Sequence, residues 1–253
     1  MAPYTEVLDK KEEINMKKIF YTLAACLFAL GFSACSDDND ALTDTTLTHY
    51  VSFELLGDEF VEVPLGTEYV DPGVKAELDG EDYTSQVTVE GLEDIDVNQL
   101  GLYEVTYSAV SPDGYPSSIT RTVAVCDPTV KTDISGKYVS QTGSGILGTS
   151  VSLAGYDFTI RKAASGIFFI SDMIGGLYAQ RAGYGSKYAL QGYISLDNDN
   201  NINVISGIVP GWGDSYEYFE NGVYDPQTKT ITYDIGYYVY DFHIILKYNK
   251  PLE

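Results

Sequence analysis

The sequence is poor in histidine, in basic residues and in cysteine. Its two histidines, His49 and His243, are too few for a zinc site built on several imidazoles. The 15 Lys and Arg face 37 Asp and Glu, which gives a formal net charge of -22 at pH 7. A chain with this excess of negative charge repels phosphate, so we exclude nucleic acid as a partner.

Long apolar runs are also scarce, and the one near the start is short. Residues 19–34 are 16 mostly apolar residues that follow the basic start Met16-Lys17-Lys18. Roughly 20 residues are needed to span a bilayer, whereas this length fits the core of a signal peptide. Residues 1–15 bring acids ahead of Met16, and we interpret them as an upstream start or an added segment. Residues 1–34 are therefore predicted to be removed.

The end of this run carries a resemblance. Phe32-Ser33-Ala34-Cys35 resembles a bacterial lipobox, which implies cleavage before Cys35 and lipid attachment to its thiol. The acids in residues 36–40 resemble the export signal of Bacteroidetes lipoproteins, which implies an outer-membrane anchor facing the extracellular side. An ordinary signal peptide is the alternative. With Cys26 removed and Cys35 lipidated, Cys126 has no partner, which excludes a disulfide framework.

The mature chain of about 219 residues is expected to form two domains. Residues 44–128 hold 18 Asp and Glu against only two basic residues, whereas residues 129–253 hold 12 against 9. This difference in charge supports a division of the chain into two parts. We expect a lipidated tether over residues 35–49, a first domain over 50–126, a linker over 127–134 and a second domain over 135–253.

The first domain has the pattern of an all-β sandwich. Apolar and polar residues alternate in short runs, broken by turn residues about every ten positions. Asp71-Pro72-Gly73 predicts a tight turn, because proline presets φ and glycine accepts the positive φ that follows. The expected strands cover residues 50–55, 60–63, 87–89, 103–107 and 121–125, with a turn at Asp113-Gly114 before the last strand.

These residues resemble a bacterial immunoglobulin-like repeat. The signature is Gly66-x-x-Tyr69-x-Asp71-Pro72-Gly73-Val74-x-Ala76, followed by Gly101-x-Tyr103 and Arg121-Thr122-Val123. The resemblance implies an immunoglobulin-like sandwich that serves as a spacer or adhesive module. It also places Tyr103 like the tyrosine corner of such domains.

The second domain is rich in aromatic residues and shows no long helical period. Expected strands cover residues 134–138, 156–160, 166–170, 188–194, 203–206, 222–224, 230–233 and 237–248. Asp197–Asn201 and Asp225–Thr230 are predicted hairpin loops. The pattern predicts a second antiparallel β-sandwich or a lipocalin-like barrel, so the fold class is all-β.

Aromatic rings lie beside glycines and carboxylates in two predicted loops of this domain. Rings with nearby acceptors suit a sugar, whose C–H face stacks on the ring while its hydroxyls bond the acids. The structural alternative is that most of the rings are core or cross-strand pairs. The candidate ligand-binding residues are Asp172, Tyr178, Trp212, Asp214, Tyr216 and Tyr218.

A second resemblance covers residues 135–250. Ile170-Ser171-Asp172-x-x-Gly175-Gly176-x-Tyr178, with Trp212-Gly213-Asp214 and the run 224–231, resembles the C-terminal domain that follows this immunoglobulin-like module in Bacteroidetes lipoproteins. That domain has no established chemistry. The resemblance implies an association with glycan capture at the cell surface.

Metal binding and catalysis have weaker support. Asp79, Glu81 and Asp82 cluster beside a glycine and are the candidates for calcium, against a solvated loop as the alternative. No other cofactor is expected. The chain has no nucleophile elbow, metalloprotease motif or phosphate loop, although Asp172, Asp214 and Glu217 could supply a carboxylate pair.

We therefore predict a non-catalytic surface lipoprotein that binds glycans or assists a glycan-uptake complex. The alternative is a structural or adhesive subunit among neighbouring outer-membrane proteins, with a glycoside hydrolase third.

Overall fold

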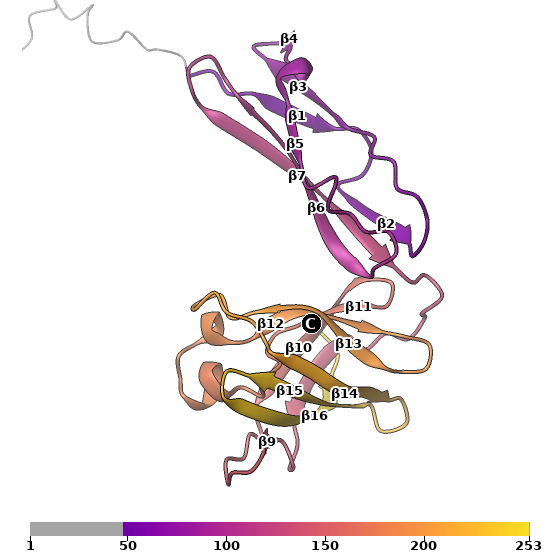
Figure 1. The fold of residues 1–253 in the computed structure, drawn as a ribbon, viewed down its shortest axis with the longest axis vertical. Helices are drawn as coiled ribbons and strands as arrows, with labels where there is room; N and C mark the ends of the chain where they lie inside the picture. Colours follow the sequence, from indigo (N-terminus) through magenta and orange to yellow (C-terminus); the bar gives the residue numbers. More distant parts are fainter. Residues whose placement is uncertain (1–47, 253) are drawn as a thin grey trace, which may run out of the picture. The chain divides into compact units, whose positions relative to one another are not determined.

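The computed structural model describes residues 48–252, and the predicted lipid-attachment residue Cys35 lies outside them. Residues 52–126 form two small sheets (Figure 1). One sheet has the order β1-β3-β4 and the other β2-β7-β6-β5, with a parallel pair between β2 and β7. The elements are β1 (Ser52–Leu55), β2 (Phe60–Pro64), β3 (Val74–Leu78), β4 (Glu81–Asp82), η1 (Thr84–Gln86), β5 (Thr88–Glu90), β6 (Gly101–Val110) and β7 (Pro116–Cys126).

The two sheets enclose one apolar core, which confirms the predicted immunoglobulin-like sandwich. Val63, Val105 and Val123 from one sheet meet Val74 from the other, because alternate side chains of each strand face inward. Tyr103 forms the expected corner, since its hydroxyl donates to the carbonyl oxygens of Asp96 and Gln99 at 3.2 Å each. Cys126 is buried and unpaired at the end of β7.

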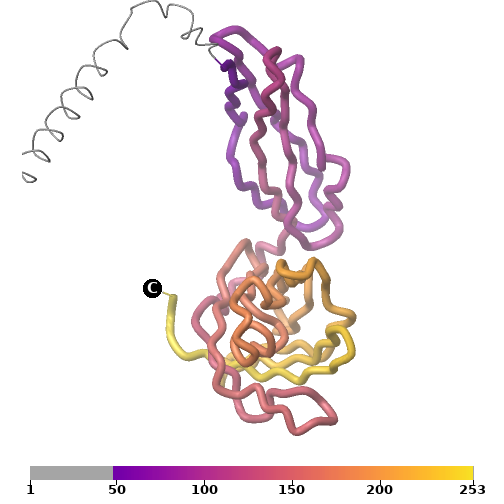
Figure 2. The backbone as a smooth tube through the Cα atoms, turned by 90° about the vertical axis from the view of Figure 1, so that its left-hand side faces the viewer, coloured from indigo at the N-terminus to yellow at the C-terminus, as the bar shows by residue number. Residues whose placement is uncertain are grey.

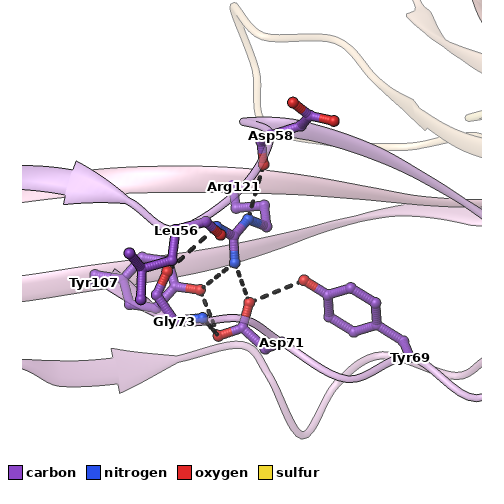
Figure 3. Close-up of polar contacts among 7 residues, drawn as sticks. All are labelled: Leu56, Asp58, Tyr69, Asp71, Gly73, Tyr107 and Arg121. Carbon is purple, nitrogen blue, oxygen red and sulfur yellow. Dashed lines mark hydrogen bonds and ion pairs between the residues drawn. The ribbon is translucent and has the colours of Figure 1, made fainter. Parts of the chain in front are cut away.

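The Asp71-Pro72-Gly73 turn places the Asp71 carboxylate beside the buried guanidinium of Arg121 (Figure 3). Gly73 takes a φ of 83°, as predicted, and its N–H bonds the Asp71 carboxylate at 3.1 Å. The carboxylate also accepts hydrogen bonds from Tyr69 at 2.9 Å and Tyr107 at 2.6 Å, and pairs with the guanidinium of Arg121. Burial alone would raise the pKa of Asp71, but these hydrogen bonds outweigh it and lower the pKa below its ordinary value.

Residues 136–250 form a single antiparallel sheet of nine strands that curls on itself (Figure 2). Its order is β13-β12-β11-β10-β8-β16-β15-β14, and β9 pairs with β16 outside this path. The elements are β8 (Gly136–Ser140), β9 (Gly145–Ile146), β10 (Asp157–Ala164), β11 (Ile167–Ile170), η2 (Leu177–Arg181), η3 (Ser186–Tyr188), β12 (Gln191–Leu196), β13 (Ile202–Ile208), β14 (Tyr218–Asp225), β15 (Thr230–Tyr237) and β16 (Tyr240–Lys250).

The two edge strands of this sheet approach each other at one end. A bridge joins Asn201 to Val223, and the N–H of Tyr224 donates to the carbonyl of Asn200 at 2.9 Å. The structure is thus a nearly closed barrel, which selects the barrel over the second sandwich. Its interior is filled by buried side chains that include Phe158, Phe168 and Phe242, as is usual in small barrels.

Two predicted strands of the barrel are wrong in their extent. The run 188–194 was expected to be strand throughout, but Tyr188 belongs to η3 and β12 begins only at Gln191. Residues 237–248 were expected to form a single strand, but β15 ends at Tyr237 and β16 begins at Tyr240. Tyr238 and Val239 form the hairpin loop between them, and Tyr238 has a φ of 57°. As a result Tyr238 is exposed and not in the core.

Among the strands of the described residues, no sheet includes members from both sides of residues 127–135, and the division into two domains with a linker over 127–134 stays a prediction. Within residues 48–252, we find no helix with the length and apolar character needed to cross a membrane.

Candidate functional site

Three connections at one end of the barrel carry the predicted ligand-binding residues. They are residues 171–190 between β11 and β12, residues 209–217 between β13 and β14, and the Tyr238-Val239 hairpin between β15 and β16. In an antiparallel meander every second connection lies at the same end, so these three are neighbours. The N–H of Gly211 donates to the carbonyl of Lys187 at 2.7 Å and links the first two.

The first connection also closes this end of the barrel. Met173, Ile174 and Leu190 are fully buried and belong to the core. Tyr233, on β15, donates from its hydroxyl to the carbonyl of Met173 at 3.0 Å, and the N–H of Met173 donates to the carbonyl of Leu190 at 2.8 Å. The helical turns η2 and η3, visible in Figure 1 between β11 and β12, are thus held on a fixed base.

Five rings meet at these connections, four of them exposed or half-buried and one, Tyr237, buried. Trp212 is at the centre: its ring centroid lies 4.8 Å from that of Tyr178, 4.9 Å from Tyr188 and 6.4 Å from Tyr184. Tyr178 in turn lies 6.0 Å from Tyr237, edge to face. Tilted and edge-to-face arrangements are the favoured geometry of aromatic pairs, so each ring holds its neighbour in place. We call Tyr178, Tyr184, Tyr188, Trp212 and Tyr237 the aromatic cluster.

Two rings of the aromatic cluster are open to solvent. Trp212 is 45% exposed and Tyr184 is 57% exposed. Partial burial raises the pKa of Tyr178, and the nearby Tyr240, Asp214, Tyr184 and Tyr238 raise it further. Tyr238 and Tyr240 are themselves exposed and therefore extend the same aromatic surface.

The short loop that bears Trp212 is fixed by backbone contacts. The N–H groups of Trp212 and Gly213 both donate to the carbonyl of Val209, at 3.0 Å and 2.8 Å. Gly211 must lack a side chain, because a Cβ there would lie 2.5 Å from the ring of Tyr188. Asp214 ends the loop and accepts a hydrogen bond of 2.8 Å from the hydroxyl of Tyr237, which is only 2% exposed. The loop thus presents the indole in one position.

Of the six predicted ligand-binding residues, the structure brings three together: Tyr178, Trp212 and Asp214. The ring of Tyr216 packs against the barrel core beside Gly207. Tyr218 covers Gly236 with its ring and donates from its hydroxyl to Asp241 at 2.8 Å. Tyr216 and Tyr218 therefore have structural contacts outside the aromatic cluster.

Asp172 lies in the core and not on a binding loop surface. It is 2% exposed, and its Oδ1 accepts from the N–H of Ile174 at 3.0 Å. Its Oδ2 has no hydrogen-bond partner among the described residues. Burial raises the pKa of Asp172 to about 7. Asp172 is thus separated by its burial from the other two carboxylates suggested for hydrolysis, Asp214 and Glu217, which are both exposed.

The calcium candidates do not form a site. Asp79 contacts His49 at 2.6 Å, and Asp82 accepts from the N–H of Thr84 at 2.9 Å. Across residues 48–252, no three or more His, Cys, Asp or Glu side chains are grouped so that they could hold a metal ion.

The sequence did not single out Tyr184, Tyr188 or Tyr237 as members of the site. Each is one tyrosine among the 14 between Ser135 and Glu253, and only the path of the loops brings it to Trp212. The available signal was their position: Tyr184 and Tyr188 share a glycine-rich connection with Tyr178.

Two family models match the chain. An immunoglobulin-like domain of bacterial surface proteins matches residues 53–125, and a family described as a C-terminal domain matches residues 127–248. Neither description names a catalytic activity. These matches confirm both resemblances and define an all-β protein of the bacterial surface.

The chain is also similar to a protein of known structure. The chain is 40% identical to the lipoprotein BT2262 from Bacteroides thetaiotaomicron, over 78% of this chain and 100% of that one, with a TM-score of 0.45. The sequence identity over this span shows the relationship: the chain belongs to this family of bacterial surface lipoproteins. No curated protein sequence matches it.

Proposed function

We propose that this protein is a surface lipoprotein that binds glycans through the aromatic cluster and catalyses no reaction. Its support is the exposed indole of Trp212, fixed among tyrosine rings beside the carboxylate of Asp214. The C–H face of a sugar packs on such rings, and its hydroxyls find acceptors in the carboxylate and the phenols. Exposed clusters of large rings of this kind commonly mark binding surfaces.

The fixed geometry supports binding further. Tyrosine and tryptophan provide a large contact area with few rotatable bonds, so little side-chain entropy is lost when a ligand is bound. The hydrogen bonds within the Val209–Asp214 loop and the contact between Gly211 and Lys187 fix the backbone before a ligand arrives. The aromatic cluster is therefore organised as a binding surface and not as a loop that must fold on contact.

The proposed cellular location, at the outer surface of the outer membrane, is supported by the leader sequence and by the family. Lipid attachment at Cys35 would anchor the chain, and the acidic residues after it support export to the outer face of the outer membrane. The immunoglobulin-like sandwich would then act as a spacer between the anchor and the barrel, in a complex with neighbouring outer-membrane proteins.

Isothermal titration of the whole protein against plant and host polysaccharides tests this proposal. Trp212→Ala should weaken binding by at least about tenfold, because central aromatic residues dominate such surfaces. Tyr115→Ala is the matched control, since Tyr115 is 42% exposed and its ring partner is Tyr50, outside the aromatic cluster. Absence of heat with every polysaccharide would favour a structural subunit, and release of sugar products would favour a hydrolase.

A further inference from the structure

The charge beside the aromatic cluster bears on which sugars could bind there. Asp214 is exposed, and within the described part of the chain its carboxylate is engaged only at Oδ1, by the buried hydroxyl of Tyr237. Burial raises the pKa of Tyr237, and the hydrogen bond to Asp214 raises it further, so the phenol keeps its proton and continues to donate at neutral pH. The carboxylate is therefore held beside the rings with lone pairs still available to a ligand.

The cations of the same connections are few, and one of them, Lys187, lies against the aromatic cluster. Residues 171–190, 209–217 and 237–241 contain three exposed carboxylates, Asp214, Glu217 and Asp241, against Arg181 and Lys187. Arg181 donates to the carbonyl of Ser152 at 2.7 Å, and Lys187 lies 5.3 Å over the ring of Tyr188. Both cations thus engage groups other than Trp212 and Asp214, and the chain as a whole carries a formal charge of -22.

A sugar with a carboxylate or sulfate group would bring a second negative charge to this surface. Recognition of such groups normally uses an arginine fork or several lysines, which this surface does not present among the described residues. An uncharged sugar instead offers hydroxyl donors, which form charge-assisted hydrogen bonds with a carboxylate.

We infer that the aromatic cluster selects uncharged glycans over anionic ones, and that Asp214 sets this preference. The inference rests on the proposed function and adds the class of ligand. Stacking on Trp212 and Tyr184 would supply contact area for either class, whereas Asp214 would reward hydroxyl groups and repel acidic groups.

Matched pairs of polysaccharides separate the claim that the protein binds glycans from the claim that it prefers uncharged ones. Hydroxyethyl cellulose with carboxymethyl cellulose, and dextran with dextran sulfate, share a backbone and differ in charge. Binding of the whole protein to each is measured by affinity electrophoresis and calorimetry at low and at high salt. The wild type should bind the uncharged member of a recognised pair about tenfold or more tightly, and added salt should reduce the difference.

The variant Asp214→Asn keeps an oxygen that can accept from Tyr237 while it removes the charge. It should narrow the preference by about tenfold, mainly by improving binding of the anionic probe. Glu217→Gln is the control, because it removes an equally exposed charge from the same connection; its preference should match the wild type.

Equal or tighter binding of the anionic probe by the wild type would overturn the inference and leave glycan binding standing. So would a preference that Asp214→Asn leaves unchanged. If the wild type binds no member of any pair and no polysaccharide of the wider panel, the proposed function fails as well.

Discussion

Arg121 is a fully buried cation whose five N–H groups are all engaged. Nε donates to the carbonyl of Asp58 at 3.0 Å, and Nη2 donates to the carbonyls of Leu56 at 2.7 Å and Gly73 at 3.3 Å. Nη1 bonds the Tyr107 hydroxyl and the Asp71 carboxylate. A buried charge is tolerated only when it is paired and fully hydrogen-bonded, so Asp71 and Arg121 depend on each other.

We expect Asp71→Asn to lower the free energy of unfolding by about 3–5 kcal/mol, because it leaves the Arg121 guanidinium buried without its counter-charge. Urea denaturation measures the change. Asp58→Asn is the control: Arg121 contacts only the backbone carbonyl of Asp58, so this variant should stay within about 0.5 kcal/mol of the wild type. Equal stability of the two variants would mean that the ion pair contributes little.

Asp172 makes the stability of the barrel depend on pH. Burial raises its pKa from 3.8 to about 7, while backbone hydrogen bonds from Ile174, Leu190 and Gly176 oppose the shift. Between these two pH values the folded protein holds a proton that the unfolded chain has released. The stabilising contribution is therefore fully present below about pH 4 and is lost as the pH rises through about 7.

Asp172→Asn keeps an oxygen that can accept from Ile174 and cannot ionise. At pH 8 it should be more stable than the wild type by on the order of a few kcal/mol, and at about pH 3.5, where Asp172 is largely protonated in both the folded and the unfolded state, the difference should nearly vanish. Thermal unfolding at both pH values tests this. The exposed Asp199→Asn is the control and should change neither value; parallel pH profiles for Asp172→Asn and the wild type would refute the expectation.

At the scale of single elements, most strands could be predicted because their alternation survives in the structure. The run 60–63 becomes β2, and the runs 103–107 and 230–233 lie within β6 and β15. The strand β3 was missed, since it follows Gly73 directly and its Val74-Lys75-Ala76 start could be read as part of the turn signature. Alternation marks a strand well, but it does not mark where a strand begins.

The hairpin at Tyr238-Val239 explains why residues 237–248 were predicted as one strand. Two-residue hairpins usually carry glycine or asparagine, which accept a positive φ. Here Tyr238 takes that conformation, at φ 57°, so no turn residue interrupts the apolar run. The register of β15 against β16 decides the turn instead, with Tyr237 opposite Tyr240.

The candidate site could be predicted only in part for a related reason. Trp212 and Tyr178 were found because each stands near a glycine and a carboxylate in its own loop. Their meeting depends on the order β13-β12-β11 and β16-β15-β14, which local sequence does not encode. Asp172 was predicted to lie on a binding loop but is buried. The neighbouring Met173 and Ile174 do not reveal from sequence alone whether this connection covers the barrel surface or packs into the barrel core.

At the scale of the whole molecule, the acidic residues are concentrated before the aromatic part. Residues 44–128 carry 18 acidic and two basic residues, so that region is soluble and poorly suited to contact anionic membrane surfaces. Together with the proposed lipid at Cys35, this distribution of charge is consistent with the proposed role of the immunoglobulin-like sandwich as a spacer between the lipid anchor and the barrel.

We expect Cys35→Ser to abolish labelling of the protein by radioactive palmitate and to release it from the membrane fraction. The thiol of Cys35 is the proposed attachment point, and a hydroxyl at this position would not be acylated in its place. Cys26→Ala, within the predicted leader, is the control and should keep the label. Label retained by Cys35→Ser, or protease treatment of intact cells that leaves the protein untouched, would contradict the proposed anchor or its surface exposure.

The three connections that carry the aromatic cluster differ in how far they contribute to the barrel core, and this affects how new specificities could arise. Met173, Ile174 and Leu190 are part of the barrel core, whereas Trp212 and the Tyr238-Val239 hairpin stand free of it. Mutations in the first group cost folding energy, while those in the second leave the scaffold intact. Divergence among relatives should therefore concentrate at Trp212 and residues 238–240, where a new ligand could be acquired without rebuilding the barrel, whereas Gly211 should be retained.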